Sequence, residues 1–211
     1  MAKVKKAAIK IIKKKWVPLY ASAEFNKEKI GETYVVETKD AIGKHISVNL
    51  MTLTHDPKKQ NLAVGLVGER VEGDGVVCRV VGYEMSPVSI KKMVRKAKTK
   101  LGDSFTLTTQ DNKEIRIKPL FITRSLASRA VCTELRKQCR ALLAVTINKM
   151  TYSAFIGEVI SRRLHKKMSD LLRKVIPLQV CEIRMFTLIE APVAPAKPTE
   201  GAAEPAAEVS A

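Results

Sequence analysis

Aromatic residues are scarce in this chain of 211 residues: they make up 5% of it, and a single one is tryptophan. Proteins that grip single-stranded nucleic acid usually stack bases on aromatic rings, so a surface built mainly for that purpose is not expected. The chain also lacks an apolar run near the roughly 18 residues that span a bilayer, which excludes a membrane helix.

Cysteines are few and show no functional spacing. Cys78, Cys132, Cys139 and Cys181 include no CxxC pair, and no histidine stands at ligand spacing from them. We interpret them as small buried thiols of a protein in a reducing compartment. The apolar stretch near the N-terminus is interrupted by Lys10 and is followed by no small-residue cleavage site, so it is not a signal peptide; a cytoplasmic protein is expected.

Catalytic motifs are missing as well. The sequence has no GxxxxGK[ST] loop, no GxSxG, no HExxH and no dinucleotide fingerprint. Its three histidines, His45, His55 and His165, are scattered, and we interpret each as hydrogen-bonded within the fold or exposed. We therefore expect no enzyme, no metal, no cofactor and no small-molecule substrate.

Positive charge, by contrast, is abundant and segregated. The chain has 38 Lys and Arg against 21 Asp and Glu, a formal net charge of +17. Residues 1–16 hold seven lysines and no acid, 86–101 hold six cations and no acid, and 124–174 hold twelve cations against three acids. Such segregation is unfavourable without a polyanion, so nucleic acid is the expected partner. A membrane surface is disfavoured, because the basic N-terminal stretch lacks a long apolar face.

The hydrophobic pattern predicts an α+β fold. Short alternating runs between residues 30 and 82, separated by turns, predict an antiparallel sheet that curls toward a barrel. A helix over 86–101, a β-hairpin over 104–118, helices over 126–176 and a closing strand over 178–189 are expected to follow.

Both ends differ in composition from the middle. Residues 1–16 are predicted to be a basic, flexible arm, and residues 191–211, rich in Ala, Pro and Glu, a disordered tail. The remaining 17–190 are expected to form one domain with a barrel-like part, 17–85, and an α+β part, 86–190.

Two features at the edges of these segments bear on binding. Trp16 stands where the arm gives way to mixed sequence, and two interpretations stay open: an anchor that packs the arm on the domain, or a residue that stacks on a base. The stretch 86–101 has helical spacing, with Pro87 in the first turn and Gly102 beyond the end, and leaves its cations on one surface for phosphates.

Lysine and arginine on helices and on an arm suit phosphate contacts with folded RNA better than sequence-specific reading of DNA. We predict contacts from the arm, from the 86–101 helix and from the helices after residue 123. The residues are Lys3, Lys5, Lys6, Lys10, Lys13, Lys14, Lys15, Lys91, Lys92, Arg95, Lys96, Lys98, Lys100, Arg124, Arg129, Arg136, Lys137, Arg140, Arg162 and Arg163.

Several short motifs occur in an order and spacing that carry a resemblance. They are Lys13-Lys14-Lys15-Trp16, Phe25-Asn26, Ile30-Gly31-Glu32-Thr33, Gly82-Tyr83-Glu84-Met85, Met93-Val94-Arg95-Lys96, Thr109 with Asp111 before Ile115-Arg116, 136–140, and Ile176-Pro177-Leu178 with 180–184. In this respect the chain resembles the S3Ae family, also called eS1, of small-subunit ribosomal proteins from archaea and eukaryotes. The short basic start looks archaeal or archaeal-like.

The resemblance implies a structural role on the platform of the small ribosomal subunit, near the exit of the messenger RNA channel. The expected partners are small-subunit rRNA and neighbouring ribosomal proteins, and direct contact with messenger RNA stays open. The family's RNA contacts carry onto Lys13, Lys14 and Lys15, and onto the pairs Arg95 with Lys96 and Arg136 with Arg140.

One departure from the family lies in the hairpin, where Asp111-Asn112 stands in place of the Asp-Gly of many relatives. Asn adopts the same backbone, so the turn is expected to be kept. An alternative to the structural role stays open: a free RNA-binding regulator or translation factor that visits the ribosome transiently. It would be substoichiometric to small subunits, whereas a structural component would not.

Overall fold

The structure, a computed structural model, describes residues 13–189. The predicted tail, 191–211, and four predicted binding residues of the arm, Lys3, Lys5, Lys6 and Lys10, lie outside the described residues. Within 13–189 the chain forms one sheet of nine strands together with five α-helices. The α+β class is therefore confirmed.

The strands and helices include a counterpart of each predicted element in the predicted order, together with a strand at 15–20 and a short helix at 50–54 that were not predicted. They are β1 (Lys15–Tyr20), β2 (Lys29–Val35), β3 (His45–Asn49), α1 (Leu50–Thr54), β4 (Leu62–Glu72), β5 (Gly75–Met85), α2 (Pro87–Met93), β6 (Lys100–Gly102), β7 (Phe105–Thr108), β8 (Glu114–Thr123), α3 (Arg129–Ile147), α4 (Tyr152–Ile160), α5 (Arg163–Leu172) and β9 (Leu178–Ile189). Three short 3-10 helices lie between them, at Ala23–Phe25, Thr38–Ala41 and Pro57–Lys59.

The sheet is open and mixed. Its main path runs β2-β1-β5-β9-β8-β6, with β3 joined to β4, β4 to β5, and β7 to β8. All the pairs are antiparallel except β1 with β5, which is parallel. The path ends at β2 and β6 among the described strands, so the curling predicted from the sequence does not close into a barrel.

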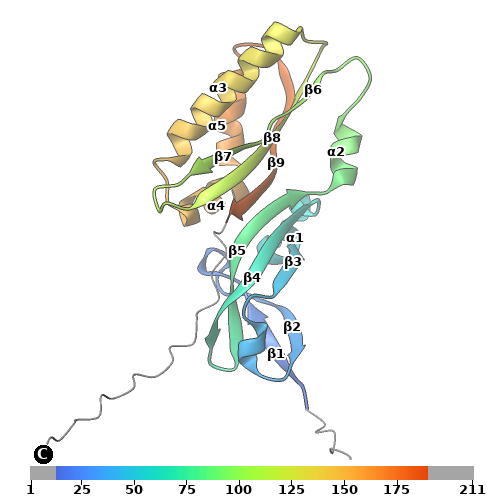
Figure 1. Cartoon of the computed structure of the whole chain (residues 1–211). Helices are drawn as coiled ribbons and strands as arrows, with labels where there is room; N and C mark the ends of the chain where they lie inside the picture. The colour runs from blue at the N-terminus through green and yellow to red at the C-terminus, as the bar shows by residue number, and fades with distance from the viewer. Residues whose placement is uncertain (1–12, 190–211) are drawn as a thin grey trace, which may run out of the picture.

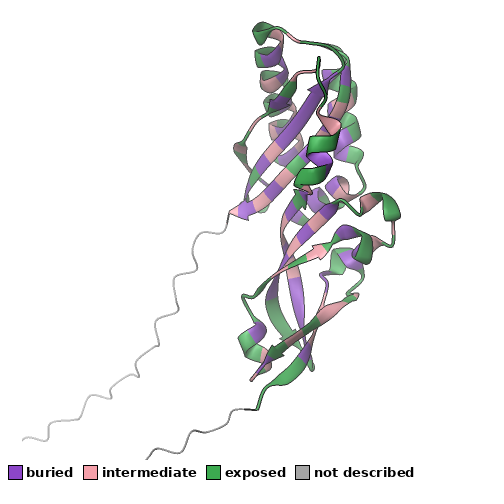
Figure 2. Ribbon diagram, turned by 90° about the vertical axis from the view of Figure 1, so that its right-hand side faces the viewer, coloured by how far each residue is buried: buried purple, intermediate pink, exposed green. Residues whose placement is uncertain are grey.

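The elements lie in two groups along the long axis of the molecule (Figure 1). Strands β1 to β5 lie at one end, and α3, α4 and α5 lie with β6 to β9 at the other. The helices pack on one face of the strands, so their inner sides are buried while their outer sides are exposed (Figure 2). Within residues 13–189 no helix has the length and apolar character needed to cross a membrane.

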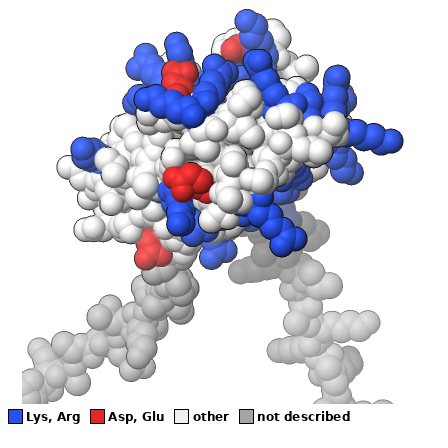
Figure 3. Space-filling view, turned by 90° about the horizontal axis from the view of Figure 1, so that it is seen from above, with Lys and Arg blue, Asp and Glu red and all other residues white. Residues whose placement is uncertain are grey.

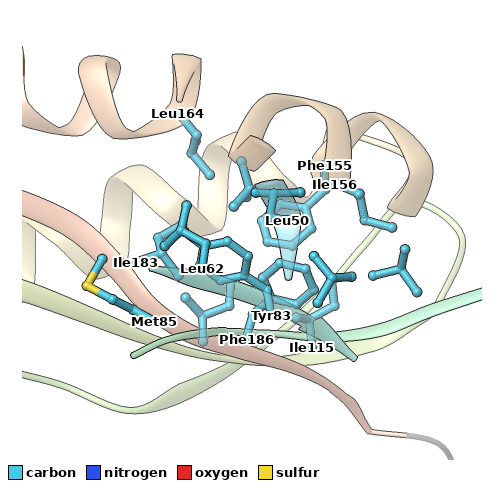
Figure 4. Close-up of a cluster of buried hydrophobic side chains, with 14 of the residues drawn as sticks. Leu50, Leu62, Tyr83, Met85, Ile115, Phe155, Ile156, Leu164, Ile183 and Phe186 are labelled. Carbon is cyan, nitrogen blue, oxygen red and sulfur yellow. The ribbon is translucent and has the colours of Figure 1, made fainter. Parts of the chain in front are cut away.

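An aromatic cluster joins the two groups (Figure 4). Strands β5 and β9 share three residue pairs, and the central one is Tyr83 with Phe186. The two rings stack with centroids 5.6 Å apart, and Phe155 of α4 meets Phe186 edge-on at 5.1 Å. Tyr83, Phe155 and Phe186 are buried within one continuous hydrophobic core. Packing of these three rings therefore reinforces the short hydrogen-bonded ladder between β5 and β9.

The helix predicted over 86–101 is the main correction. Pro87 stands in the first turn as expected, but the helix ends at Met93, and Gly102 lies in a strand. Leu101 pairs with Phe121 of β8 and is 3% exposed. The like charges in the second half of 86–101 disfavour a helix there. Pairing with β8 instead buries the side chain of Leu101, which a continued helix would leave unburied.

The two hairpins agree with the prediction. Strands β4 and β5 are joined by a turn in which Gly73 has a φ of 63°. Strands β7 and β8 are joined by a turn in which Asn112 has a φ of 56°, the left-handed backbone that Asp-Gly turns use. The closing strand also occupies 178–189 as predicted.

Helix boundaries after residue 126 are partly as predicted. Helices α3, α4 and α5 lie within the predicted 126–176, and α4 is capped by the Thr151 hydroxyl, which accepts from the Ala154 amide at 3.4 Å. The basic residues of 162–167 lie at the start of α5, because Arg162 has a φ of 60° and breaks the helical segment there.

The cysteine prediction is confirmed for all four residues. Each is buried and none forms a disulfide. Burial raises the pKa values of Cys139 and Cys181 to about 12, so both stay protonated at neutral pH. They contribute as apolar side chains of the core.

Candidate nucleic-acid interface

Three segments that are far apart in the sequence meet at the end of the molecule that carries β6 and the start of α3. The Thr99 amide donates to the Thr123 hydroxyl at 3.0 Å, and the Thr123 amide donates to the Thr99 carbonyl at 3.1 Å. The Arg124 amide donates to the Pro177 carbonyl at 3.1 Å. These bonds hold together residues 94–100, 123–129 and 171–179.

The three segments contain eight cations and no Asp or Glu. We call this group the cationic end: Arg95, Lys96, Lys98, Lys100, Arg124, Arg129, Arg173 and Lys174. Seven are exposed, and Lys98, which is half-buried, donates through Nζ to the side-chain oxygen of Gln179. Seen from above in Figure 3, Lys and Arg predominate over the few acids on this surface.

The cations of the cationic end differ from the paired cations elsewhere in the described residues. None of the eight forms an ion pair with another described residue, whereas Lys27 pairs with Glu72 at 2.8 Å and Lys167 pairs with Glu158 at 2.9 Å. A set of unpaired like charges held close together repels itself in the free protein. The arrangement is therefore suited to an extended polyanion.

Arg140, a predicted contact, is engaged within the protein. Its Nε and Nη2 atoms donate to the two carboxylate oxygens of Asp103, each at 2.7 Å, and its guanidinium lies 5.6 Å from the Phe105 ring. The hydrogen bonds from Arg140 hold the pKa of the Asp103 carboxyl below its usual value. The charge of Arg140 is largely neutralised, and the residue lies outside the cationic end.

Arg162 is likewise paired, with its Nη2 atom 3.3 Å from Oε1 of Glu182. It precedes α5, and Arg163 begins that helix, while Arg173 and Lys174 follow its last turn. A helix of ten residues is about 15 Å long, so the two basic groups begin from opposite ends of α5. The structure thus divides the basic stretch that the sequence presents as one.

The remaining predicted residues lie on other surfaces. Lys91 and Lys92 are exposed on α2, and Arg136 and Lys137 lie further along α3. The lysines at 13–15 lie at the start of β1, at the opposite end of the molecule from α3 (Figure 1). Lys15 lies near Asp74, with Nζ 4.0 Å from the carboxylate.

Two residues of the cationic end, Arg173 and Lys174, were missed by the sequence-based prediction of contacts. They follow α5, in the segment whose Pro177 carbonyl accepts from the Arg124 amide. The sequence did contain one indication that they belong to a cationic surface, since residues 171–179 include no acid. Cations near a helix C-terminus also stabilise its dipole, which gives them a second role.

Trp16 does not pack as an anchor. Its side chain is 65% exposed, and its ring lies 5.0 Å from the ring of Tyr34, which is 51% exposed. Strand register places the two residues opposite each other on β1 and β2. An exposed aromatic pair is therefore present despite the low aromatic content.

His165 is neither exposed nor hydrogen-bonded at Nδ1, contrary to the prediction. It is 7% exposed, and Nδ1 has no hydrogen-bond partner among the described residues. It shares the inner face of α5 with Leu164, Met168 and Leu172. Burial lowers its pKa to about 4, with Arg162 adding to the shift, so the imidazole is neutral at pH 7.

Among residues 13–189, no three His, Cys, Asp or Glu side chains gather in a group that could hold a metal ion. The chemistry of the cationic end is that of Lys and Arg donors presented to an anion. Such donors bind phosphate as point charges or, for Arg, as a two-donor fork.

A family model described as the ribosomal S3Ae family matches residues 2–192. The chain belongs to this family. It is 28% identical over 181 residues to the small ribosomal subunit protein eS1 of Sulfurisphaera tokodaii, and the match covers 85% of this chain and 93% of that protein. It is 26% identical over 179 residues to the protein of the same name from Saccharolobus islandicus, covering 85% and 86% of the two chains. These relatives are archaeal. Membership makes the chain a ribosomal protein and not an enzyme, as the sequence predicted.

Proposed function

We propose that this chain is a structural constituent of the small ribosomal subunit that binds small-subunit rRNA through its cationic end. The observation that carries the proposal is the gathering of eight Lys and Arg residues without an ion pair to another described residue. Phosphates of folded RNA supply the missing counter-charge, and the counterions they release provide the driving force.

The family resemblance supports a finer placement. We propose a position on the platform near the exit of the messenger RNA channel, in the cytoplasm, beside neighbouring small-subunit ribosomal proteins. Contact with messenger RNA would follow from that position. The hydrophobic core runs without interruption from β1 to β9, which supports the proposal that 17–190 act as one domain.

Other cations are proposed as secondary contacts. They extend the cationic end along α2 through Lys91 and Lys92 and along α3 through Arg136 and Lys137. We rank Arg140 and Arg162 lower as contacts, because each already holds a carboxylate.

Removing charges from the cationic end is expected to reduce the salt dependence of rRNA binding. In the triple variant Arg95→Gln, Lys96→Gln and Arg124→Gln, the slope of log K against log salt should fall by about 0.9 for each phosphate of duplex-like RNA that the variant no longer neutralises. Filter binding or fluorescence anisotropy with a fragment of small-subunit rRNA, over a series of salt concentrations, measures the slope.

A triple variant of paired cations that are not predicted contacts is the matched control, with the same loss of charge: Lys27→Gln, Lys59→Gln and Lys167→Gln. It should leave the slope nearer to that of the wild type. An equal fall of the slope in the two variants would show that only net charge matters and would remove the case for the cationic end.

Stoichiometry distinguishes a structural constituent from a transient factor. We expect the protein to co-sediment one-to-one with small subunits in a gradient and to stay bound through a moderate salt wash, whereas a transient factor would be substoichiometric and would wash off. Quantitative mass spectrometry of the gradient fractions measures the ratio. Recovery mainly in the ribosome-free fractions would contradict the structural role.

A further inference from the structure

The exposed pair Trp16 and Tyr34 lies on the outer face of the β1–β2 hairpin. The register of the two strands sets these side chains opposite each other, and the alternate residues Val17, Leu19 and Val35 point to the other face and are buried. The core is therefore complete without the two rings. Their exposed fractions of 65% and 51% leave a continuous apolar surface open at this place.

The surroundings of the pair are cationic. Lys14 places its Nζ atom 5.9 Å from the centre of the Tyr34 ring, and Lys13 next to it is exposed. The acid on the same face of β2, Glu32, is held by Lys29 at 2.7 Å. Two rings bordered by lysines that pair with no acid within residues 13–189 fit an anionic ligand that has flat faces better than an apolar protein surface.

We propose that Trp16 and Tyr34 form a stacking platform for an unpaired nucleotide base of RNA, with Lys13 and Lys14 reaching the flanking phosphates. This inference rests on the proposed function, since it takes RNA as the ligand. It adds a second kind of contact, with the face of an unpaired base, at the opposite end of the molecule from the cationic end.

The ring geometry limits how a base binds. The two planes are tilted by 40°, so a base cannot lie parallel to both. It stacks on the larger indole face of Trp16, and Tyr34 contacts its edge. Stacking of this kind tolerates any base, because every base has a π-face.

Trp16 is the sole tryptophan of the chain, so its fluorescence reports on the platform directly. The full-length protein is titrated with a 12-nucleotide unstructured RNA and, separately, with a 12-base-pair RNA duplex. We expect the single strand to quench Trp16 fluorescence and the duplex to leave it nearly unchanged. Trp16→Leu should weaken binding of the single strand about tenfold and leave duplex binding unchanged.

Three further variants make the test specific. Tyr34→Leu keeps the fluorophore and should reduce affinity for the single strand by a smaller factor, while Trp16→Tyr keeps a ring and should retain most of the affinity. Val145→Ala removes a 58% exposed apolar side chain from α3 and should change nothing. Circular dichroism of each variant verifies the fold.

The outcomes separate this inference from the proposed function. Binding of both RNAs without quenching, or with no loss in Trp16→Leu, overturns the platform and leaves rRNA binding by the cationic end intact; the pair would then be a contact for a protein neighbour. Failure of the wild type to bind either RNA overturns both. Quenching by the single strand together with selective loss of affinity in Trp16→Leu supports the platform.

Discussion

Phe186→Ala is expected to lower the free energy of unfolding by about 3–5 kcal/mol. Phe186 is 1% exposed and touches the rings of Tyr83 and Phe155, which come from the two groups of elements that it joins (Figure 4). Its removal leaves a cavity at a junction where the two strands share a ladder of only three residue pairs. Urea denaturation followed by circular dichroism measures the loss of stability.

Phe186→Leu is the matched control, since it keeps much of the apolar volume and should cost less than the alanine variant. A change below about 1 kcal/mol in Phe186→Ala would show that the aromatic cluster does not stabilise the junction. Because the core is continuous, the wild type should unfold in a single transition.

Lowering the pH from 6.5 to 4 is expected to lower the free energy of unfolding by about 3 kcal/mol, because His165 is buried as a neutral imidazole. The imidazole takes up its proton at about pH 4 in the folded protein and near 6.5 in the unfolded chain. In this window the unfolded chain binds more protons, so stability falls as the pH falls. Below about pH 4 both states are protonated, and this group causes no further loss.

The difference between two variants isolates this effect. His165→Leu removes the titrating group and should flatten the dependence of stability on pH between 6.5 and 4, while His45→Gln alters an exposed histidine and should keep the wild-type dependence. Carboxylates such as Asp103, whose pKa is lowered by Arg140, contribute equally in both variants. A wild-type slope in His165→Leu would contradict the assignment.

Local patterns were sufficient for most of the element order. The hairpins β4–β5 and β7–β8, helix α3 and strand β9 follow from alternation, turn residues and helical spacing, which act within a few residues. The second half of 86–101 shows the limit. Its spacing is helical, but Leu101 gains more from pairing with Phe121 of β8, and that partner is far away in the sequence.

The candidate surfaces depend even more on distant partners. Charge counting found the basic stretches, but it could not show that Asp103 engages Arg140, 37 residues away, or that the segment after α5 hydrogen-bonds to Arg124 through Pro177. Trp16 could not be assigned between two interpretations because Tyr34 meets it only through strand pairing. The burial of His165 could not be predicted, because its spacing with Leu172 marks a buried helix face only when the helix is known to begin at Arg163.

The short ladder between β5 and β9 has a mechanical consequence. Bending a protein about a ladder of three residue pairs strains few hydrogen bonds, and one of these pairs contains Gly82, which has no side chain to resist the movement. We therefore expect the angle between the two halves to yield more easily than the structure within either half. During assembly, partners that contact both halves would then set that angle without unfolding either half.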